Sequence, residues 1–247
     1  MSRTVPVRVL PDAAGVAGEA AAEFERVALA ACAKHGAFRV ALSGGTTPRA
    51  TYELLADARA PHRGAIPWDK VHVFFGDERQ VPPDSRSSNI GMACETLLRH
   101  VPIPDAQIHR MRGENPDPDR AAEEYEEILR DAFHIGPRER PRFDLILLGM
   151  GEDGHTASLF PGSKGLEEKD RLAIATRAPV EPSGRITLTL PVLNAAAEAL
   201  VLVTGAGKAS AFARVRAGGA ELPAARLRPD NGTLVWLADR AAAGGTA

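Results

Sequence analysis

The sequence of 247 residues has few cysteines, few aromatic side chains and almost no net charge. Its two cysteines, Cys32 and Cys94, are far apart in the chain, so neither a disulfide framework nor a cysteine-rich metal cluster is expected. The formal net charge of −2 gives no basic field for nucleic acid or an acidic membrane, so an anionic ligand would need a local site. No apolar run approaches the length of a membrane span, and the N-terminus lacks the apolar core of a signal peptide. These absences predict a cytoplasmic protein with neither a membrane nor a nucleic-acid partner.

Hydrophobic residues make up 44 % of the chain and charged residues 25 %, which is the balance of a globular protein that buries its own core. Apolar strand-like runs alternate with helical patterns. This alternation predicts an α/β fold with a Rossmann-like, open, mostly parallel sheet and helices on both faces. We expect one domain over residues 1–247, because no repeat or shift in composition divides the chain. The expected strands cover residues 5–10, 38–42, 71–75, 145–148, 172–176, 186–190, 199–203 and 233–237.

Four of these strands end in polar loops that contain glycine. The carboxyl ends of parallel strands meet at one edge of a sheet, and α/β proteins bind their ligands there. Convergence of several such loops favours a site more strongly than any one of them does. The four loops are Ser43–Pro48, Gly76–Arg79, Gly149–His155 and Thr204–Lys208.

The first loop, SGGTTP, is a glycine turn before a helix that we expect to begin at or just after Pro48. Free backbone N–H groups and the helix dipole at such a terminus suit a phosphate group, which would lie on Ser43, Gly44, Gly45 and Thr46. Taken alone, the motif is explained equally well by a tight strand-to-helix turn with no ligand.

Two cations are candidates for binding the same anion. Lys208 ends the string TGAGK at the start of a helix, where the positive end of the helix dipole disfavours a cation unless an anion bridges the two. Arg185 begins the apolar run RITLTL, and a solvated arginine at a strand end is the alternative interpretation. The spacing of a nucleotide phosphate loop is absent around TGAGK, so an NTPase is not expected.

The loop after the strand at 145–148 carries Asp153 and His155. An imidazole has a pKa near neutral pH, so His155 can act as a general base toward water. Three glycines of this loop also fit the dinucleotide fingerprint. However, a proline and a glycine at 161–162 end the segment before the long helix that the fingerprint requires, which argues against dinucleotide binding.

The loop Gly76–Arg79 carries Asp77 and Arg79. An arginine can hold an anion or stabilise a developing oxyanion, whereas the plain alternative is a solvated turn with an internal ion pair. The sequence has no nucleophile elbow of a serine hydrolase and no His, Cys and carboxylate grouping with zinc spacing, so neither chemistry is expected.

The strings SGGTTP, FFGDERQVPPDSRSSN, LILLGMGEDGHTASLFPG and TGAGKA together resemble the 6-phosphogluconolactonase family over nearly the whole chain. The resemblance implies a fold of the glucosamine-6-phosphate deaminase/ribose-5-phosphate isomerase type and no metal or organic cofactor. It also implies hydrolysis of 6-phospho-D-glucono-1,5-lactone to 6-phosphogluconate in the oxidative pentose phosphate pathway. The related glucosamine-6-phosphate deaminases use a glutamate in ring opening at the position where this chain has Phe160, which counts against deaminase activity.

The resulting hypothesis makes His155 the base that activates water. Arg79 would lie near the developing oxyanion, and Asp77 and Asp153 would orient His155 or the sugar. The substrate phosphate would lie on residues of two loops and one strand end. These expected ligands are Ser43, Gly44, Gly45, Thr46, Arg185 and Lys208.

Two alternative functions stay open at this point. One is a glucosamine-6-phosphate deaminase-like isomerase, and the other is a non-catalytic effector domain that binds a sugar phosphate. The sequence is compatible with a monomer or a small homo-oligomer.

Overall fold

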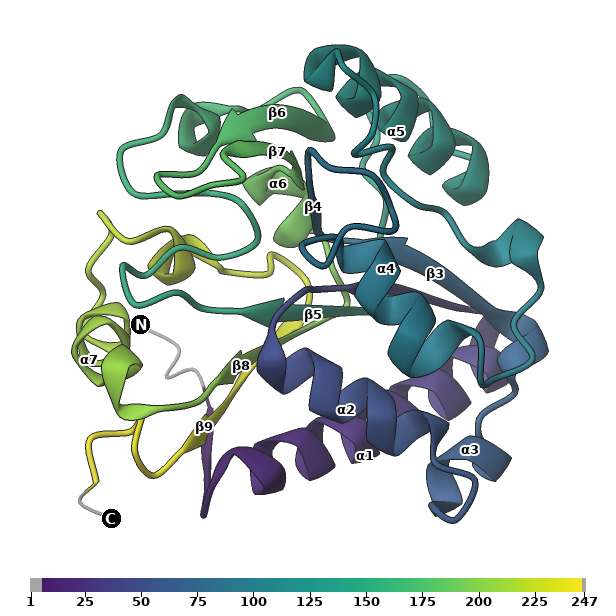
Figure 1. The fold of residues 1–247 in the computed structure, drawn as a ribbon, viewed down its shortest axis with the longest axis horizontal. Helices are drawn as coiled ribbons and strands as arrows, with labels where there is room; N and C mark the ends of the chain where they lie inside the picture. The colour runs from purple at the N-terminus through teal and green to yellow at the C-terminus, as the bar shows by residue number, and fades with distance from the viewer. Residues whose placement is uncertain (1–5, 246–247) are drawn as a thin grey trace.

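The central feature of the computed structural model, which describes residues 6–245, is a six-stranded sheet (Figure 1). The strand order is β1-β9-β8-β5-β2-β3, and every neighbouring pair is parallel. The predicted parallel sheet is therefore confirmed, although the predicted start of the first strand at residue 5 lies outside the described residues. The strands are β1 (Val7–Leu10), β2 (Phe38–Leu42), β3 (Val71–Phe75), β5 (Leu145–Gly149), β8 (Glu198–Val203) and β9 (Thr233–Asp239).

Helices cover both faces of this sheet, as predicted (Figure 1). In β5, Leu145 and Leu147 pack with α1 and α2, whereas Ile146 and Leu148 pack on the other side with α5, because successive side chains of a strand point to opposite faces. No helix among residues 6–245 is long and apolar enough to cross a membrane. The α-helices are α1 (Ala13–His35), α2 (Thr46–Ala56), α3 (Pro61–Ala65), α4 (Asn89–Ala93), α5 (Pro118–Phe133), α6 (Leu190–Leu193) and α7 (Ala209–Arg216). The shorter segments are η1 (Trp68–Lys70), η2 (Cys94–Leu98, a π-helix), η3 (Asp105–Gln107), η4 (Lys164–Glu167), η5 (Ala206–Lys208) and η6 (Pro223–Arg226).

A second, three-stranded antiparallel sheet is the main departure from the predicted architecture. It lies on the same side of the large sheet as α5 (Figure 1). The sequence predicts two of its strands, at 172–176 and 186–190, but not their separate antiparallel sheet, and it predicts a loop where the third lies. The expectation of a loop at 76–79 is wrong. The connection 178–183 between β6 and β7 is too short for a parallel crossover, which needs a dozen or more residues, so the two strands must form a hairpin. The strands are β4 (Asp77–Arg79), β7 (Gly184–Leu188) and β6 (Ala173–Arg177), in the order β4-β7-β6.

Gly76 is the point at which the chain passes from one sheet to the other. Its N–H donates to the carbonyl of Leu42 in β2 at 2.8 Å, whereas its own carbonyl accepts from the N–H of Leu188 in β7 at 2.9 Å. The three residues that follow form β4. The string GDER is thus a strand that is attached directly to the carboxyl end of β3.

Helix starts in this fold are fixed by capping side chains and by a glycine turn. Asp12 caps α1 and Ser88 caps α4, each with a side-chain oxygen that accepts a backbone N–H. The sequence predicts that helix α2 begins at or just after Pro48. This prediction is wrong by two residues, since α2 begins at Thr46. Gly45, with φ of 110°, turns the chain there, and Pro48 occupies the first turn, where its missing N–H is not needed.

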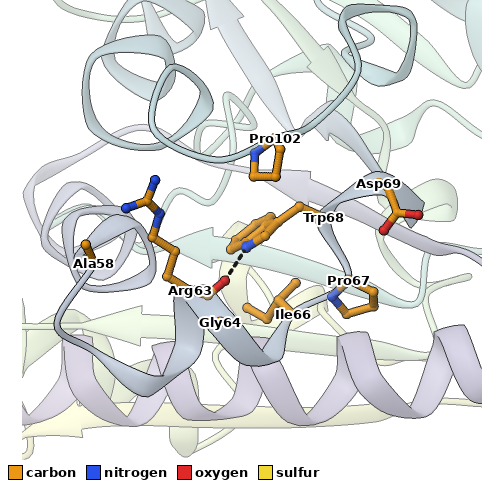
Figure 2. A pocket seen from close by; sticks show the side chains of 8 residues that line it. All are labelled: Ala58, Arg63, Gly64, Ile66, Pro67, Trp68, Asp69 and Pro102. Carbon is orange, nitrogen blue, oxygen red and sulfur yellow. Dashed lines mark hydrogen bonds between the residues drawn. The ribbon is translucent and has the colours of Figure 1, made fainter.

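A cavity of about 580 Å³ lies beside α3 and the amino end of β3 (Figure 2). Trp68 forms part of its wall and is almost fully buried, and the indole N–H donates to the carbonyl of Arg63 at 2.9 Å. Because it lies at the amino end of β3, this cavity is separate from the loops at the carboxyl ends of the strands. Its lining residues are Ala58, Arg63, Gly64, Ile66, Pro67, Trp68, Asp69 and Pro102.

Candidate active site

The polar loops lie together at one edge of the large sheet, because β8, β5, β2 and β3 are neighbours in it. The hydroxyl oxygens of Thr47 and Thr204 are 2.7 Å apart, which joins the loop after β2 to the loop after β8. Gly207 of the latter lies so close to Glu152, in the loop after β5, that a Cβ at position 207 would be 2.3 Å from the Glu152 Oε1. The loops after these three strands are therefore in direct contact.

His155 is partly exposed on the loop after β5, with 34 % of its side chain accessible. Its Nδ1 lies 2.6 Å from Oδ1 of Asp153, and the same oxygen accepts the backbone N–H of His155 at 3.0 Å. A neutral imidazole that donates Nδ1–H to Asp153 keeps its lone pair on Nε2. The ring of Phe160 packs against the imidazole with 4.7 Å between centroids. Asp153 and Phe160 therefore fix the orientation of a group that can accept a proton at Nε2.

The glycines of this loop make room for the imidazole. A Cβ on Gly151 would lie 2.1 Å from Nδ1 of His155. The N–H of Gly151 donates to the carbonyl of His155 at 2.9 Å, and Gly154 adopts φ of 79°, which glycine tolerates best. The spacing that resembles a dinucleotide fingerprint thus serves a tight turn that closes on His155.

Asp77 is buried and makes no hydrogen bond to His155. Its Oδ2 accepts the hydroxyl of Ser158 at 2.6 Å, and its Oδ1 accepts the amide of Asn89 at 3.2 Å. Of the two carboxylates predicted to orient His155 or the sugar, only Asp153 contacts the imidazole directly.

Glu78 is a residue of this region for which the sequence analysis assigned no function. It is 1 % exposed, and its carboxylate accepts the backbone N–H groups of Arg79, Asn89 and Ile90 at 2.7–2.8 Å. Burial raises the pKa of Glu78, while these N–H donors oppose the rise. The interpretation of GDER as a solvated turn is therefore wrong. Side chains alternate between the two faces of a strand, so Glu78 points away from the face that Asp77 and Arg79 share. This alternation is the signal that could have shown its separate role.

Arg79 and Arg185 stand directly opposite each other on β4 and β7, so they share one face of the small sheet. Among residues 6–245 neither forms an ion pair with a carboxylate. Arg79 donates to the carbonyl of Ser87 at 2.5 Å, and Arg185 donates to the carbonyls of Gly184, at 2.9 Å, and Pro182. Arg185 is only 6 % exposed, which contradicts the alternative of a solvated strand-end arginine. Burial and the neighbouring charge of Arg79 lower the pKa of Arg185, so an anion bound here would relieve a real electrostatic cost.

The loop after β2 holds a buried hydroxyl without a partner. The backbone of Ser43 is fixed by Tyr52, whose hydroxyl accepts the Ser43 N–H at 3.0 Å and donates to the Ser43 carbonyl at 2.9 Å. The Oγ of Ser43 is buried, and the described residues provide it with no hydrogen-bond partner. Gly45 and Thr46 follow at the amino end of α2. A buried, unsatisfied hydroxyl beside a helix N-terminus indicates a place for a polar ligand.

Lys208 is the last residue of η5 and the N-cap residue of α7, in agreement with its predicted place at a helix start. Burial lowers the pKa of Lys208, and the charges of Glu152 and Asp239 oppose this effect. Within the described part of the chain the ammonium of Lys208 forms no ion pair with a carboxylate. The same part of the chain contains no group of three or more His, Cys, Asp and Glu side chains that could hold a metal ion.

Comparison with known proteins identifies the family of the chain. Residues 11–236 match the family model described as glucosamine-6-phosphate isomerases/6-phosphogluconolactonase. The chain belongs to this family. It is 42 % identical over 212 residues to the 6-phosphogluconolactonase of Nostoc sp., with 85 % of each chain covered. The resemblance drawn from the sequence motifs is thereby confirmed.

Solved structures support the fold assignment. The structure of 6-phosphogluconolactonase from Trypanosoma brucei matches all of this chain over its own full length, with a TM-score of 0.87 and 30 % identity. A monomeric glucosamine-6-phosphate deaminase matches with a TM-score of 0.79 at 18 % identity and covers 97 % of this chain and 99 % of its own. This second likeness concerns the fold alone, and it confirms the predicted deaminase-type architecture.

Proposed function

We propose that this protein hydrolyses 6-phospho-D-glucono-1,5-lactone to 6-phospho-D-gluconate, a step of the oxidative pentose phosphate pathway. Such a substrate combines an electrophilic ester carbonyl with a dianionic phosphate. The observation that carries the proposal is the His155–Asp153 pair, 2.6 Å apart, on the loop after β5. Lys208 on the loop after β8 and the facing Arg79 and Arg185 of the small sheet are cations that form no ion pair with a carboxylate among residues 6–245. The names and identity of the relatives support the same substrate.

In the proposed reaction, Nε2 of His155 removes a proton from water as the water oxygen attacks the lactone carbonyl carbon. The imidazolium that forms is stabilised by the carboxylate of Asp153. The carbonyl oxygen becomes an oxyanion, for which the guanidinium of Arg79 is the proposed partner. The tetrahedral intermediate collapses, the bond from carbon to the ring oxygen breaks, and His155 returns its proton to that oxygen as it becomes a hydroxyl.

We place the phosphate of the substrate on the loop after β2, with Arg185 and Lys208 as its cations. The hydroxyl of Ser43, which has no hydrogen-bond partner among residues 6–245, and the amino end of the eleven-residue α2 support this placement. Both cations are at least half-buried and lack a carboxylate partner in the described residues, so a dianion would restore charge balance.

Phe160 favours lactone hydrolysis over deamination. Its ring is 8 % exposed and packs on the imidazole of His155, where a related deaminase would have a glutamate to open the sugar ring. A phenyl ring cannot transfer protons, so we expect no ammonia release from glucosamine 6-phosphate. The paired His155 and Asp153 likewise favour an enzyme over a non-catalytic effector domain.

The test is lactone hydrolysis at neutral pH, corrected for the spontaneous reaction, with phosphorylated and unphosphorylated lactones compared. His155→Ala should lower the rate by about 10²–10⁴-fold, because general-base catalysis contributes that much. His35→Ala is a matched control: His35 is also a partly exposed histidine bonded to an aspartate, Asp144, at 2.9 Å, but it lies at the end of α1. Near-normal turnover in His155→Ala would refute the assignment of the base. Unchanged affinity for the phosphorylated lactone in Lys208→Ala and Arg185→Ala would refute the phosphate site.

The single-domain organisation, the cytoplasmic location and the oligomeric state stay predictions from the sequence. The proposed partner is a small sugar phosphate, and the mechanism uses only side chains and backbone groups of this chain.

A further inference from the structure

We propose that Ser158 is a positioning residue for this reaction, which fixes the distance between His155 and the small antiparallel sheet by binding Asp77. The proposal rests on the proposed function, since it concerns the rate of the same reaction. It also gives buried Asp77 a role other than direct contact with the imidazole.

Ser158 connects the loop that carries His155 to two strands at once. Its side chain is 1 % exposed, and its hydroxyl donates to Oδ2 of Asp77 in β4 at 2.6 Å. Its backbone N–H donates to Oγ1 of Thr187 in β7 at 3.2 Å. Asp77 and Thr187 are direct partners in the β4–β7 register, so both bonds reach the same point of the small sheet.

Thr156 anchors the same turn to the large sheet. Its hydroxyl donates to the carbonyl of Gly149, at the end of β5, at 2.9 Å. Thr156 is fully buried, as Ser158 nearly is, and buried hydroxyls are stable only when they are hydrogen-bonded. The turn that begins directly after His155 is therefore attached to β5 at one residue and to β4 two residues later.

Ala157, between the two anchors, has φ of 48°. A non-glycine residue in this left-handed region is strained, and the strain persists only where the surroundings impose it. The N–H of Leu159 donates to the carbonyl of Thr156 at 3.0 Å and closes the turn. The hydroxyl of Ser158 is thus one of the restraints that hold a turn which would otherwise relax.

Strand β4 connects the Ser158–Asp77 hydrogen bond to the catalytic groups, because it also carries Arg79. Asp77 is two residues before Arg79 on that strand, so the Ser158–Asp77 bond sets the separation between the base and the proposed oxyanion partner. Loss of this bond should misplace His155 relative to Arg79 while the contact with Asp153 stays intact. Of the proposed phosphate ligands, only Arg185 lies on the small sheet, whereas the others lie on the loops after β2 and β8, so substrate affinity should change much less than kcat.

The experiment compares kcat, KM and the pH profile of kcat/KM in the full-length protein and its variants. Ser158→Ala should lower kcat about 10- to 100-fold, because a misplacement of about 1 Å costs on the order of 10²-fold and a smaller one costs less, with KM within about threefold and the acid limb of the profile unmoved. Thr189→Val is the control. Thr189 is a fully buried hydroxyl at the end of β7 that donates to the carbonyl of Arg171 at 2.8 Å, so its loss should lower stability and leave kcat unchanged.

A double-mutant cycle with Asp77→Ala, which removes the acceptor of the Ser158 hydroxyl, separates positioning from general damage. If Ser158 acts through Asp77, adding Ser158→Ala to Asp77→Ala should lower kcat by less than twofold further, whereas independent roles give multiplied losses. Multiplied losses, or a kcat within twofold of wild type in Ser158→Ala, would overturn the proposal. If Ser158→Ala does not fold, Ser158→Cys, which keeps the volume and weakens the donor, is measured with the same criteria. No lactone hydrolysis by the wild-type chain would instead refute the proposed function.

Discussion

Gly151 is the position at which one added methyl group should disable the proposed base. A Cβ there would lie 2.1 Å from Nδ1 of His155 and 2.7 Å from Oδ1 of Asp153. Gly151 is not among the glycines with positive φ, so alanine meets no backbone strain at this position. The effect of Gly151→Ala should therefore arise from displacement of the His155–Asp153 pair.

The size of the effect follows from the displacement. Ordinary van der Waals contact to a Cβ begins near 3.4 Å, so the imidazole or the turn must move by about 1.3 Å to accommodate the methyl group. A misplacement of about 1 Å costs on the order of 10²-fold in rate, which corresponds to about 2.7 kcal/mol in the activation barrier. We expect kcat to fall at least about 10²-fold. KM should change little, because the proposed phosphate ligands lie on other segments of the chain.

The assay is steady-state hydrolysis of the phosphorylated lactone at neutral pH, with the spontaneous rate subtracted. Gly149→Ala is the matched control, because apart from its two chain neighbours no residue in 6–245 lies within 4 Å of the added Cβ, and the position is on the same segment. This control should keep the wild-type rate. A wild-type rate in Gly151→Ala would refute the steric argument, and an equal loss in both variants would show general damage to the loop.

Two further predictions concern stability. Gly44→Ala should push aside the amide of Asn89, whose Oδ1 would lie 2.0 Å from the added methyl group. This movement breaks the hydrogen bonds from Asn89 to Asp77. We therefore expect the free energy of unfolding, measured in urea, to fall by about 1–3 kcal/mol. Gly64→Ala, where the added Cβ meets open space, should change stability by less than about 1 kcal/mol, and equal losses in the two variants would contradict the contact argument. Burial, aided by the nearby His72, lowers the pKa of His109 to about 4, so below about pH 6.5 the unfolded chain binds more protons than the native one. The contribution of His109 to stability should therefore be fully present above about pH 6.5 and be lost as the pH falls toward 4. In thermal melts, His109→Gln should make stability depend less on pH in this range. An unchanged pH dependence in this variant would contradict the role of His109.

The large sheet could be predicted because its signals are local. The run Leu145–Leu148 is apolar at every position, as expected for a strand covered on both faces, and its residues do alternate between the two cores. The glycine loops follow the strands directly, so a parallel arrangement already places them at one edge. The pairing of His155 with Asp153 is also local, because the two residues are two positions apart.

The small sheet could not be predicted in the same way. A strand of three residues, Asp77–Arg79, carries no usable periodicity, and its pairing with Gly184–Leu188 joins segments more than a hundred residues apart. Whether Asp77 faces His155 or Ser158 depends on that pairing. The burial of Arg185 beside Arg79 depends on it too, since a lone arginine at a strand end gives no sign of its neighbour.

The sequence by itself determined the α/β class, the four loops, the family and the identity of the proposed base. Apolar runs, glycine turns and short motifs each involve only a few consecutive residues, so they can be recognised without the tertiary structure. Only the tertiary structure decided which groups meet. In the tertiary structure Asp77 accepts hydrogen bonds from Ser158 and Asn89, and Glu78 accepts a backbone N–H at the amino end of α4. Arg79 and Arg185 are direct partners on neighbouring strands. Long-range strand register controls these contacts, and a shift of one residue would turn each side chain to the opposite face.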